Sequence, residues 1–448
     1  MNARQVAHQV LINIKSQGTY GNNALQKAFS KEVLSIQDKA LITEIVYGTL
    51  THYSLLIFLL QPYFQGRVKI WVRMLLVMSL YQLLYLEKIP NYAIIDAATQ
   101  IAKDRGGEFN AKAVNAILRR VTKAISDGNL RPVDEIADET QRLATKYSHP
   151  EWLIRLWMAQ YGTDSTMQML PKNNERARMV LRVNGTKLDR DKLQKKLSDE
   201  GITCILGSLS DAALIVIEGN PLATEAFKEG LFYIQDEASM LPALALAPSE
   251  KAHVLDVCAA PGGKTFQIAE MVGDLGLVYA YDIYQHKVTR IKENAKRLNI
   301  QNVEATVCSA LELETLHQSE SFDYVLVDAP CSGLGILRRH PEAKHTKKPE
   351  DLDAIIQIQE EILASSAKLV APGGRLVYST CTVNKKENQR QIEAFLQKNP
   401  DFELDPDFES RMPAQLKNNF ENGMLQLLPQ DFETDGFFIA SLVKHLRW

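Results

Sequence analysis

The feature that most constrains this chain is an alternation of apolar runs and helical patterns from about residue 236 onward. The runs are rich in Val, Leu and Tyr, as buried strands are, and helical periodicity lies between most of them. They are "HVLDVCA" (253–259), "LVYAYDI" (277–283), "VEATVCS" (303–309), "FDYVLVDAP" (322–330), "GGRLVYSTC" (373–381) and "GFFIASLV" (436–443). This layout predicts a doubly wound α/β sheet, with ligands bound at the carboxyl ends of its strands.

The part before residue 236 divides into three further segments. From 1 to about 130, apolar residues recur at three and four spacing, as in Val6, Val10 and Ile14, which predicts an all-α domain of five to seven helices. A linker and the helix "PEWLIRLWMAQYG", expected to end on Gly162, fill 131–170. In 171–235, short β-like runs surround a charged helix, which predicts a small ferredoxin-like module. The segment 236–448 forms the last domain.

Charge and cysteine content narrow the partners and the compartment. Residues 1–130 hold 15 Lys and Arg against 8 Asp and Glu, a net charge of +7 that leaves −10 on the remainder. This indicates either an anionic partner such as nucleic acid or a solvated helical surface. The five cysteines form no CxxC pair, so we expect no metal site and a reducing, cytoplasmic compartment. The apolar run around Gln82 is interrupted and short, so we expect no membrane span.

A glycine-rich turn, "LDVCAAPGGKT", joins the first of these strands to a helix. It resembles a phosphate-binding loop, but that loop needs glycine where Cys258 stands, and Pro261 would lie in the phosphate cradle. Asp282, 19 residues after Gly263 at the end of the next strand, suits a ribose, although alone it could be a helix cap. Ser309, ending the third strand, could approach an adenine. Without GxGxxG, the pattern favours S-adenosylmethionine over NAD.

Two cysteines, Cys331 and Cys381, each follow a strand end, and Asp328 stands just before the first. Carbon 5 of cytosine is a poor nucleophile until a thiolate adds to carbon 6 and breaks the aromaticity of the ring. Asp328 is placed to hold the N3 edge of such a base, and a second cysteine could help to release the product. Each cysteine alone could be a buried small apolar residue, and the pattern does not say which one attacks.

The motifs "CAAPGGKT", "DAPCSG", "RRHP" and "VYSTCT" resemble the RNA cytosine-C5 methyltransferases of the Sun/Fmu family. "DKALITEIVYGTL" is similar to the NusB-like RNA-binding domain of the subgroup that acts on 16S ribosomal RNA, and "YIQDEAS" also matches. The resemblance covers essentially the full chain. It implies a NusB-like domain at 1–130 and a Rossmann-like methyltransferase at 236–448 with a mostly parallel, seven-stranded sheet.

The resemblance also implies residue roles. Cys381 would attack carbon 6, Cys331 would assist release and Asp328 would contact the base. The cofactor, S-adenosylmethionine, would be held by Cys258, Ala259, Ala260, Pro261, Gly262, Gly263, Lys264, Asp282, Ser309 and Asp328. Relatives commonly carry an acid at the position of Ser309, and Thr-Cys-Ser where this chain has Thr-Cys-Thr. Neither change removes a catalytic group.

The implied reaction is 5-methylcytosine formation in 16S ribosomal RNA, at position 967, by a cytoplasmic monomer. Two alternatives remain: a transfer RNA substrate, or a non-catalytic RNA-binding or antitermination factor.

The segment "ILRRHPEAKHTKK" carries five Lys and Arg between Arg338 and Lys348, so it is expected either to bind phosphates or to be an exposed charged loop. Basic residues of the first domain could extend this RNA track: Arg4, Arg67, Lys69, Arg119 and Arg120.

Overall fold

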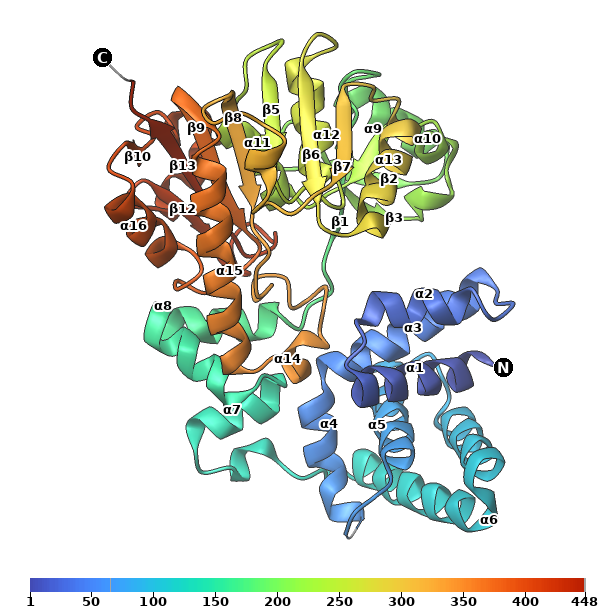
Figure 1. Ribbon diagram of the computed structural model, residues 1–448. Helices are drawn as coiled ribbons and strands as arrows, with labels where there is room; N and C mark the ends of the chain where they lie inside the picture. The colour runs from blue at the N-terminus through green and yellow to red at the C-terminus, as the bar shows by residue number, and fades with distance from the viewer. Residues whose placement is uncertain (65, 447–448) are drawn as a thin grey trace. The chain divides into compact units, whose positions relative to one another are not determined.

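The computed structural model describes residues 1–64 and 66–446 (Figure 1). The chain forms two compact units. The first combines Met1–Arg176 with the segment Leu337–Lys347, and the second combines Ala177–Ile336 with the chain from Lys348 onward. Each unit has its own buried core, and each is described by itself.

The first unit is helical, which confirms the prediction for the N-terminal domain. Two of its helices begin with capping boxes, at Asn2 and Ser35, where side chain and backbone satisfy each other's hydrogen bonds. Apolar faces of the helices pack into one core around Leu11, Ile45 and Leu75, which are fully buried. The helices are α1 (Ala3–Gln17), α2 (Gly21–Phe29), α3 (Ile36–Thr51), α4 (Tyr53–Leu60), α5 (Ile70–Tyr85), α6 (Asn91–Ser126), α7 (Glu139–Tyr147), α8 (Glu151–Lys172) and α14 (Ala343–Thr346).

Two glycines interrupt helices of this unit, so that α6 and α8 each consist of two helical segments joined at a kink. Gly107 in α6 has φ of 75°, and Gly162 in α8 has φ of 78°, a region that favours glycine. The helix that begins after Pro150 therefore ends at Gly162, as predicted. A second helical segment follows the kink and continues to Lys172.

The segment 337–347, called the anchor segment below, is buried in the first unit through α14. Lys344 Nζ donates to the Thr51 carbonyl at 3.2 Å and to Asn174 Oδ1, and Glu342 Oε1 accepts from the backbone N–H of Gly21 at 2.9 Å. The expectation of an exposed, phosphate-gripping loop is wrong for Arg338 and Lys344, which are only 8% and 2% exposed. The Lys344 side chain meets protein groups because the segment packs among the helices of this unit.

Burial lowers the pKa of Lys344 to about 7 from its ordinary 10.5. Between these values the folded chain binds fewer protons than the unfolded chain, so stability should rise as the pH rises from about 7 to 10.5. We expect the melting temperature of Lys344→Met to rise less over pH 7 to 9 than that of the unchanged protein. Lys112→Met, at an exposed position of α6, is the control and should keep the original slope. Parallel slopes for Lys344→Met and the unchanged protein would contradict the assignment.

The second unit begins with a four-stranded antiparallel sheet in the order β2-β3-β1-β4. The predicted β-α-β-β module is present, and a fourth strand of three residues pairs with β1. That strand is too short to give a sequence pattern. The elements are β1 (Met179–Val183), α9 (Arg190–Asp199), β2 (Thr203–Leu206), β3 (Ala213–Glu218), α10 (Glu225–Lys228) and β4 (Phe232–Ile234).

A larger sheet follows, in the order β11-β12-β13-β9-β8-β5-β6-β7, with β10 paired to β13. The doubly wound fold is confirmed, with one difference: within the described residues the sheet has nine strands rather than seven, and only β9-β8-β5-β6-β7 is parallel. The unpredicted strands have two to four residues. The strands are β5 (His253–Asp256), β6 (Leu277–Asp282), β7 (Val303–Val307), β8 (Phe322–Asp328), β9 (Val370–Thr380), β10 (Phe402–Leu404), β11 (Phe420–Glu421), β12 (Met424–Leu427) and β13 (Phe437–Lys444).

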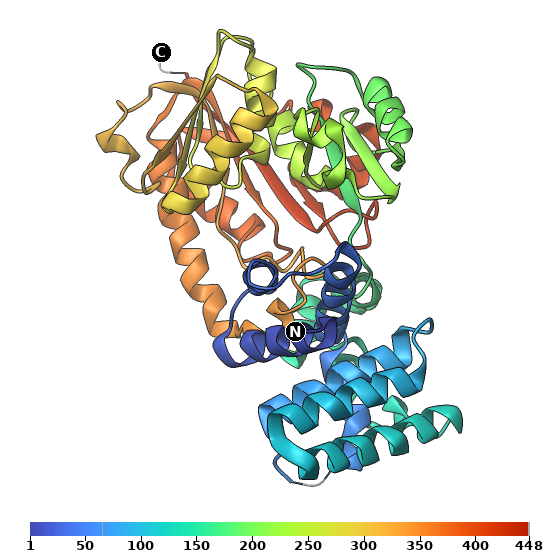
Figure 2. The same cartoon turned by 90° about the vertical axis from the view of Figure 1, so that its right-hand side faces the viewer.

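Helices cover both faces of this sheet (Figure 2). Alternate strand residues such as Val254 and Leu255 point into two separate cores, one under α11, α12 and α13 and the other under α15 and α16. The strand β5 lies between β6 and β8, so the strand order reverses there, and doubly wound sheets bind ligands at the carboxyl ends beside such a reversal. The helices are α11 (Glu237–Leu246), α12 (Gly263–Val272), α13 (Gln285–Leu298), α15 (Pro349–Ala367) and α16 (Gln389–Lys398).

Within the described residues, no single helix is long and apolar enough to cross a membrane. The helix α3 together with Tyr53–Tyr63 passes that test only as a pair bent by 75°.

Candidate active site

The turn after β5 has the geometry of a ligand-binding loop. Gly262 caps α12 with φ of 105°, and a Cβ there would lie 2.5 Å from the ring of Phe266, so the turn requires glycine. Thr265 Oγ1 donates to Asp256 Oδ2 at 2.7 Å and ties the helix start to the strand end. The first-turn N–H groups of α12 have no partners within the helix, so they are available to a ligand at this edge.

Carboxylates gather around the buried thiol of Cys258, which lies in this turn. Burial raises the pKa of Cys258 well above its ordinary value, and Asp256, Asp328 and Asp282 raise it further. Burial also raises the pKa of Asp256 to about 7. Cys258 therefore keeps its proton, and the acids around it favour a positively charged ligand.

Asp282 ends β6 and Ser309 follows β7, at the same edge of the sheet. Asp282 Oδ1 accepts from the backbone N–H of Tyr284 at 3.0 Å, and its other oxygen lies 3.4 Å from Lys287 Nζ. Ser309 Oγ accepts from the backbone N–H of Leu311 at 3.2 Å. Each of these groups caps a local turn, yet both remain at the strand ends where the sequence predicts the nucleoside.

Asp328, the last residue of β8, is held from two sides. Lys264 Nζ lies 2.7 Å from its Oδ2, and Ser379 Oγ donates to its Oδ1 at 2.7 Å. The carboxylate side chain is 27% exposed, so a ligand can reach it. Lys264 was predicted to line the cofactor site, and the structure pairs it directly with the acid predicted to contact the base.

The two predicted thiols lie side by side. Cys331 Sγ and Cys381 Sγ are 3.3 Å apart, although 50 residues separate them in the chain. The hydrogen bond with Cys381, then burial, then the charge of Glu387 raise the pKa of Cys331 well above its ordinary value. Cys331 therefore keeps its proton at neutral pH.

The structure brings the predicted residues to one edge of one sheet. Asp328 pairs in register with Ser379, which stands two residues before Cys381, so the acid and both thiols leave neighbouring strands together. Sequence reasoning missed Ser379 and also Glu387, whose carboxylate is fully buried beside both cysteine loops. Neither residue lies in a recognisable spacing, so only their tertiary contacts reveal them.

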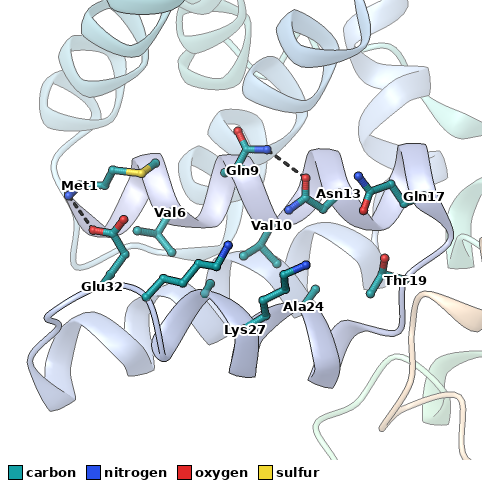
Figure 3. A pocket seen from close by; sticks show the side chains of 12 residues that line it. Met1, Val6, Gln9, Val10, Asn13, Gln17, Thr19, Ala24, Lys27 and Glu32 are labelled. Carbon is teal, nitrogen blue, oxygen red and sulfur yellow. Dashed lines mark hydrogen bonds and ion pairs between the residues drawn. The ribbon is translucent and has the colours of Figure 1, made fainter.

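Two cavities lie away from these residues. One, of about 210 Å³, is formed by α1 and α2 of the first unit, with Val6, Val10 and Ala24 inside and Lys27 at its rim (Figure 3). The other, of about 840 Å³, is lined by parts of the antiparallel module, α11 and α12, including the ion pair of Arg182 and Glu270. Neither cavity contains a predicted site residue.

The fold and this edge define a class: a doubly wound transferase domain with a nucleoside-type turn and a thiol pair, carried on a chain with a helical N-terminal domain. Residues 243–443 match the model of the 16S rRNA methyltransferase RsmB/F family. Residues 1–123 match the NusB family, and 149–223 match the ferredoxin-like domain of RsmF/B-like methyltransferases.

Curated relatives extend this match over the whole chain. The chain is 42% identical over 445 residues to the probable ribosomal RNA small subunit methyltransferase B of Bacillus subtilis, covering 99% of both chains. It is 33% identical to the ribosomal RNA small subunit methyltransferase B of Vibrio vulnificus, covering 99% of this chain and 100% of the relative. The chain therefore belongs to the RsmB/F family of ribosomal RNA methyltransferases.

Solved structures agree. The crystal structure of PH0851 has a TM-score of 0.83 at 26% identity and covers 99% of both chains. A methyltransferase homologue from Pyrococcus horikoshii has a TM-score of 0.60 at 27% identity, with 69% of this chain and all of that chain covered. These likenesses confirm the predicted fold class.

Gly335 gives a direct test of how the thiol loops pack. A Cβ there would lie 2.1 Å from the carbonyl oxygen of Gly436 and 2.9 Å from that of Cys381. We expect Gly335→Ala to lower stability by about 1–3 kcal/mol, because the loops must move apart to make room. Gly185→Ala is the matched control, since its Cβ would meet only Glu270 Oε2, at 3.9 Å. Thermal melts check both; equal melting temperatures would refute the close packing.

Proposed function

We propose that this chain transfers a methyl group from S-adenosylmethionine to carbon 5 of a cytosine in 16S ribosomal RNA. By resemblance the target is position 967. The observation that carries the proposal is the pair of thiols 3.3 Å apart, next to Asp328 at the carboxyl edge of the parallel strands. A methyltransferase acting on oxygen or on an exocyclic nitrogen would not need such a pair.

The chemistry follows from the electron demand of the base. The sulfur of Cys381 forms a bond to carbon 6, and the electrons of the ring double bond move toward carbon 5. Carbon 5 would then be nucleophilic enough to accept the methyl group that the cofactor would supply. Transfer of the proton on carbon 5 to water would restore the double bond as the carbon 6–sulfur bond breaks, which returns Cys381 as a thiolate. Asp328 is held by Lys264 and Ser379, so it can orient the N3 edge of the ring throughout.

The environment of the thiols supports this division of roles. The hydrogen bond with Cys381, burial and the nearby Glu387 raise the pKa of Cys331, which disfavours its thiolate. The family resemblance assigns Cys381 as the attacking sulfur. Cys331, 3.3 Å from the sulfur that must later leave, is placed to assist release.

The residues present fit S-adenosylmethionine. When bound, this cofactor supplies an electrophilic methyl group on a positively charged sulfur. Asp282 and Asp328 stand near the turn that would hold it, which suits a sulfonium. The constrained glycine at 262 lets a ligand approach the start of α12, and Asp282 can accept from ribose hydroxyls.

Substitution separates the two thiols. We expect Cys381→Ala to abolish methyl transfer and to form no protein–RNA adduct, because no sulfur reaches carbon 6. Cys331→Ala should instead accumulate a covalent adduct, visible on a denaturing gel with labelled 16S fragments. Cys204→Ala, a buried thiol of β2, is the control and should behave as the unchanged protein. An adduct with Cys381→Ala would reverse the assignment.

Cofactor binding can be tested without RNA. We expect Asp282→Asn to weaken S-adenosylmethionine binding by about tenfold or more, because an amide accepts less strongly than a carboxylate from ribose hydroxyls. Asp274→Asn, in the turn between α12 and β6, is the control. Titration calorimetry measures both; an unchanged dissociation constant for Asp282→Asn would place the ribose elsewhere.

One measurement distinguishes the proposed function from its two alternatives, a transfer RNA substrate and a non-catalytic RNA-binding factor. Bisulfite sequencing of ribosomal and transfer RNA from a deletion strain distinguishes a 16S target, a transfer RNA target and a non-catalytic factor. We expect loss of one modified cytosine, in 16S ribosomal RNA. The net charge of +7 on residues 1–130 supports an RNA partner for that domain. We propose that the protein acts as a monomer in the cytoplasm, where its substrate is assembled.

A further inference from the structure

A buried carboxylate lies between the two cysteine loops and, apart from its effect on the pKa of Cys331, has no part in the chemistry above. Glu387 precedes α16, six residues after Cys381, and its side chain is fully buried. Removing a carboxylate from water is costly unless hydrogen-bond donors replace the lost water. The partners of this side chain therefore show what the burial achieves.

One set of donors comes from the loop that carries Cys331. The Ser332 backbone N–H donates to Glu387 Oε2 at 2.8 Å, and Ser332 Oγ donates to Oε1 at 2.5 Å. Gln359 of α15 donates both to Glu387 Oε2, at 3.0 Å, and to the carbonyl of Pro330, at 2.9 Å. The residues on both sides of Cys331 are thus held by this carboxylate or by its partner.

A second set reaches the loop that carries Cys381. Asn384 Nδ2 donates to Glu387 Oε1 at 3.1 Å. Ser332 Oγ and Thr382 Oγ1 are 2.7 Å apart. Thr382 Oγ1 also lies 3.4 Å from Glu387 Oε1, so the two hydroxyls and the carboxylate form one hydrogen-bonded cluster. This cluster joins the two loops side chain to side chain.

The neighbouring Asn388 completes the grip on the second loop. Its Oδ1 accepts from Thr380 Oγ1 at 2.7 Å, and its Nδ2 donates to the Thr382 carbonyl at 2.9 Å. The two residues that flank Cys381 are therefore both fixed by one buried amide. Glu387 and Asn388, adjacent in the chain, together hold the backbone on each side of both thiols.

We propose that Glu387 is a positioning residue: its buried carboxylate locks the loops of Cys331 and Cys381 together and sets the separation of the two sulfurs. The effect of Glu387 on catalysis rests on the proposed function, but its effect on the placement of the two sulfurs does not. Loss of the carboxylate leaves several buried donors without an acceptor, so the loops must rearrange to find water or new partners. Its charge is also among the groups that raise the pKa of Cys331.

The sharpest test uses the full-length protein without RNA or cofactor. Diamide oxidises two neighbouring thiols: each sulfur loses one electron and its proton, a disulfide forms, and the diazene is reduced to the hydrazine. The rate of the Cys331–Cys381 disulfide, followed by peptide mass mapping, reports how well the sulfurs are held together. We expect Glu387→Ala to slow this rate by roughly tenfold or more. Glu237→Ala, which removes another buried carboxylate of the same unit, should leave it unchanged.

A second variant guards against simple unfolding. Glu387→Asp keeps the charge but is one methylene shorter, so it can reach only part of the donor set and should give an intermediate rate. If Glu387→Ala does not melt cooperatively, Glu387→Asp decides the matter. A folded variant that forms the disulfide at the original rate would overturn the proposal, whichever of the two it is.

Two further measurements distinguish a positioning role of Glu387 from general structural damage. They also keep a failure of this inference distinct from a failure of the proposed function. The pH midpoint for alkylation of Cys331 should fall in Glu387→Ala and stay unchanged in Glu237→Ala, because only the first removes the nearby charge. With 16S fragments, kcat should drop by about a hundredfold while KM for RNA changes little, as expected when reacting groups are misplaced. Failure of the unchanged protein to form any RNA adduct would overturn the proposed function and leave the disulfide result standing.

Discussion

The structure depends on the parallel pairing of β8 with β9. In this register Asp328 lies opposite Ser379, and their side chains are joined by a hydrogen bond. Because parallel strands end at the same edge, the loops that follow them emerge together. The acid and two distant cysteines thereby become neighbours without any local sequence contact, and every functional proposal above starts from this register.

A second constraint is electrostatic. The turn after β5 collects carboxylates around the thiol of Cys258, and only Lys264 and Lys287 offer nearby positive charge to Asp328 and Asp282 among the contacts described. Such a site favours a cationic ligand and keeps Cys258 protonated and inert. The adjacent thiol pair differs, since the proton of Cys331 is held partly by Cys381 itself. Chemically similar residues thus acquire different roles from their surroundings.

The two units are connected covalently more than once, because the chain passes from one to the other repeatedly. After Ile336, the chain leaves the second unit, passes through the first unit as the anchor segment, and returns at Lys348. Lys344 is buried there with only a carbonyl and an amide oxygen as described acceptors, which explains its lowered pKa. From composition alone, the basic residues of "ILRRHPEAKHTKK" predict an RNA-binding loop. Arg338 and Lys344 are instead buried, and Lys344 hydrogen-bonds within the helical unit.

Local patterns determined much of this protein. Apolar runs and helical spacing located six strands of the large sheet and the all-α domain, and the glycine turn with Asp282 indicated a nucleoside site, because these signals come from neighbouring residues. The short strands β10, β11 and β12 left no such pattern. Tertiary structure alone decided the 3.3 Å approach of Cys331 and Cys381, the burial of Lys344 and the place of Glu387. Those features depend on which groups lose water together, and that is settled only when segments far apart in the chain pack against each other.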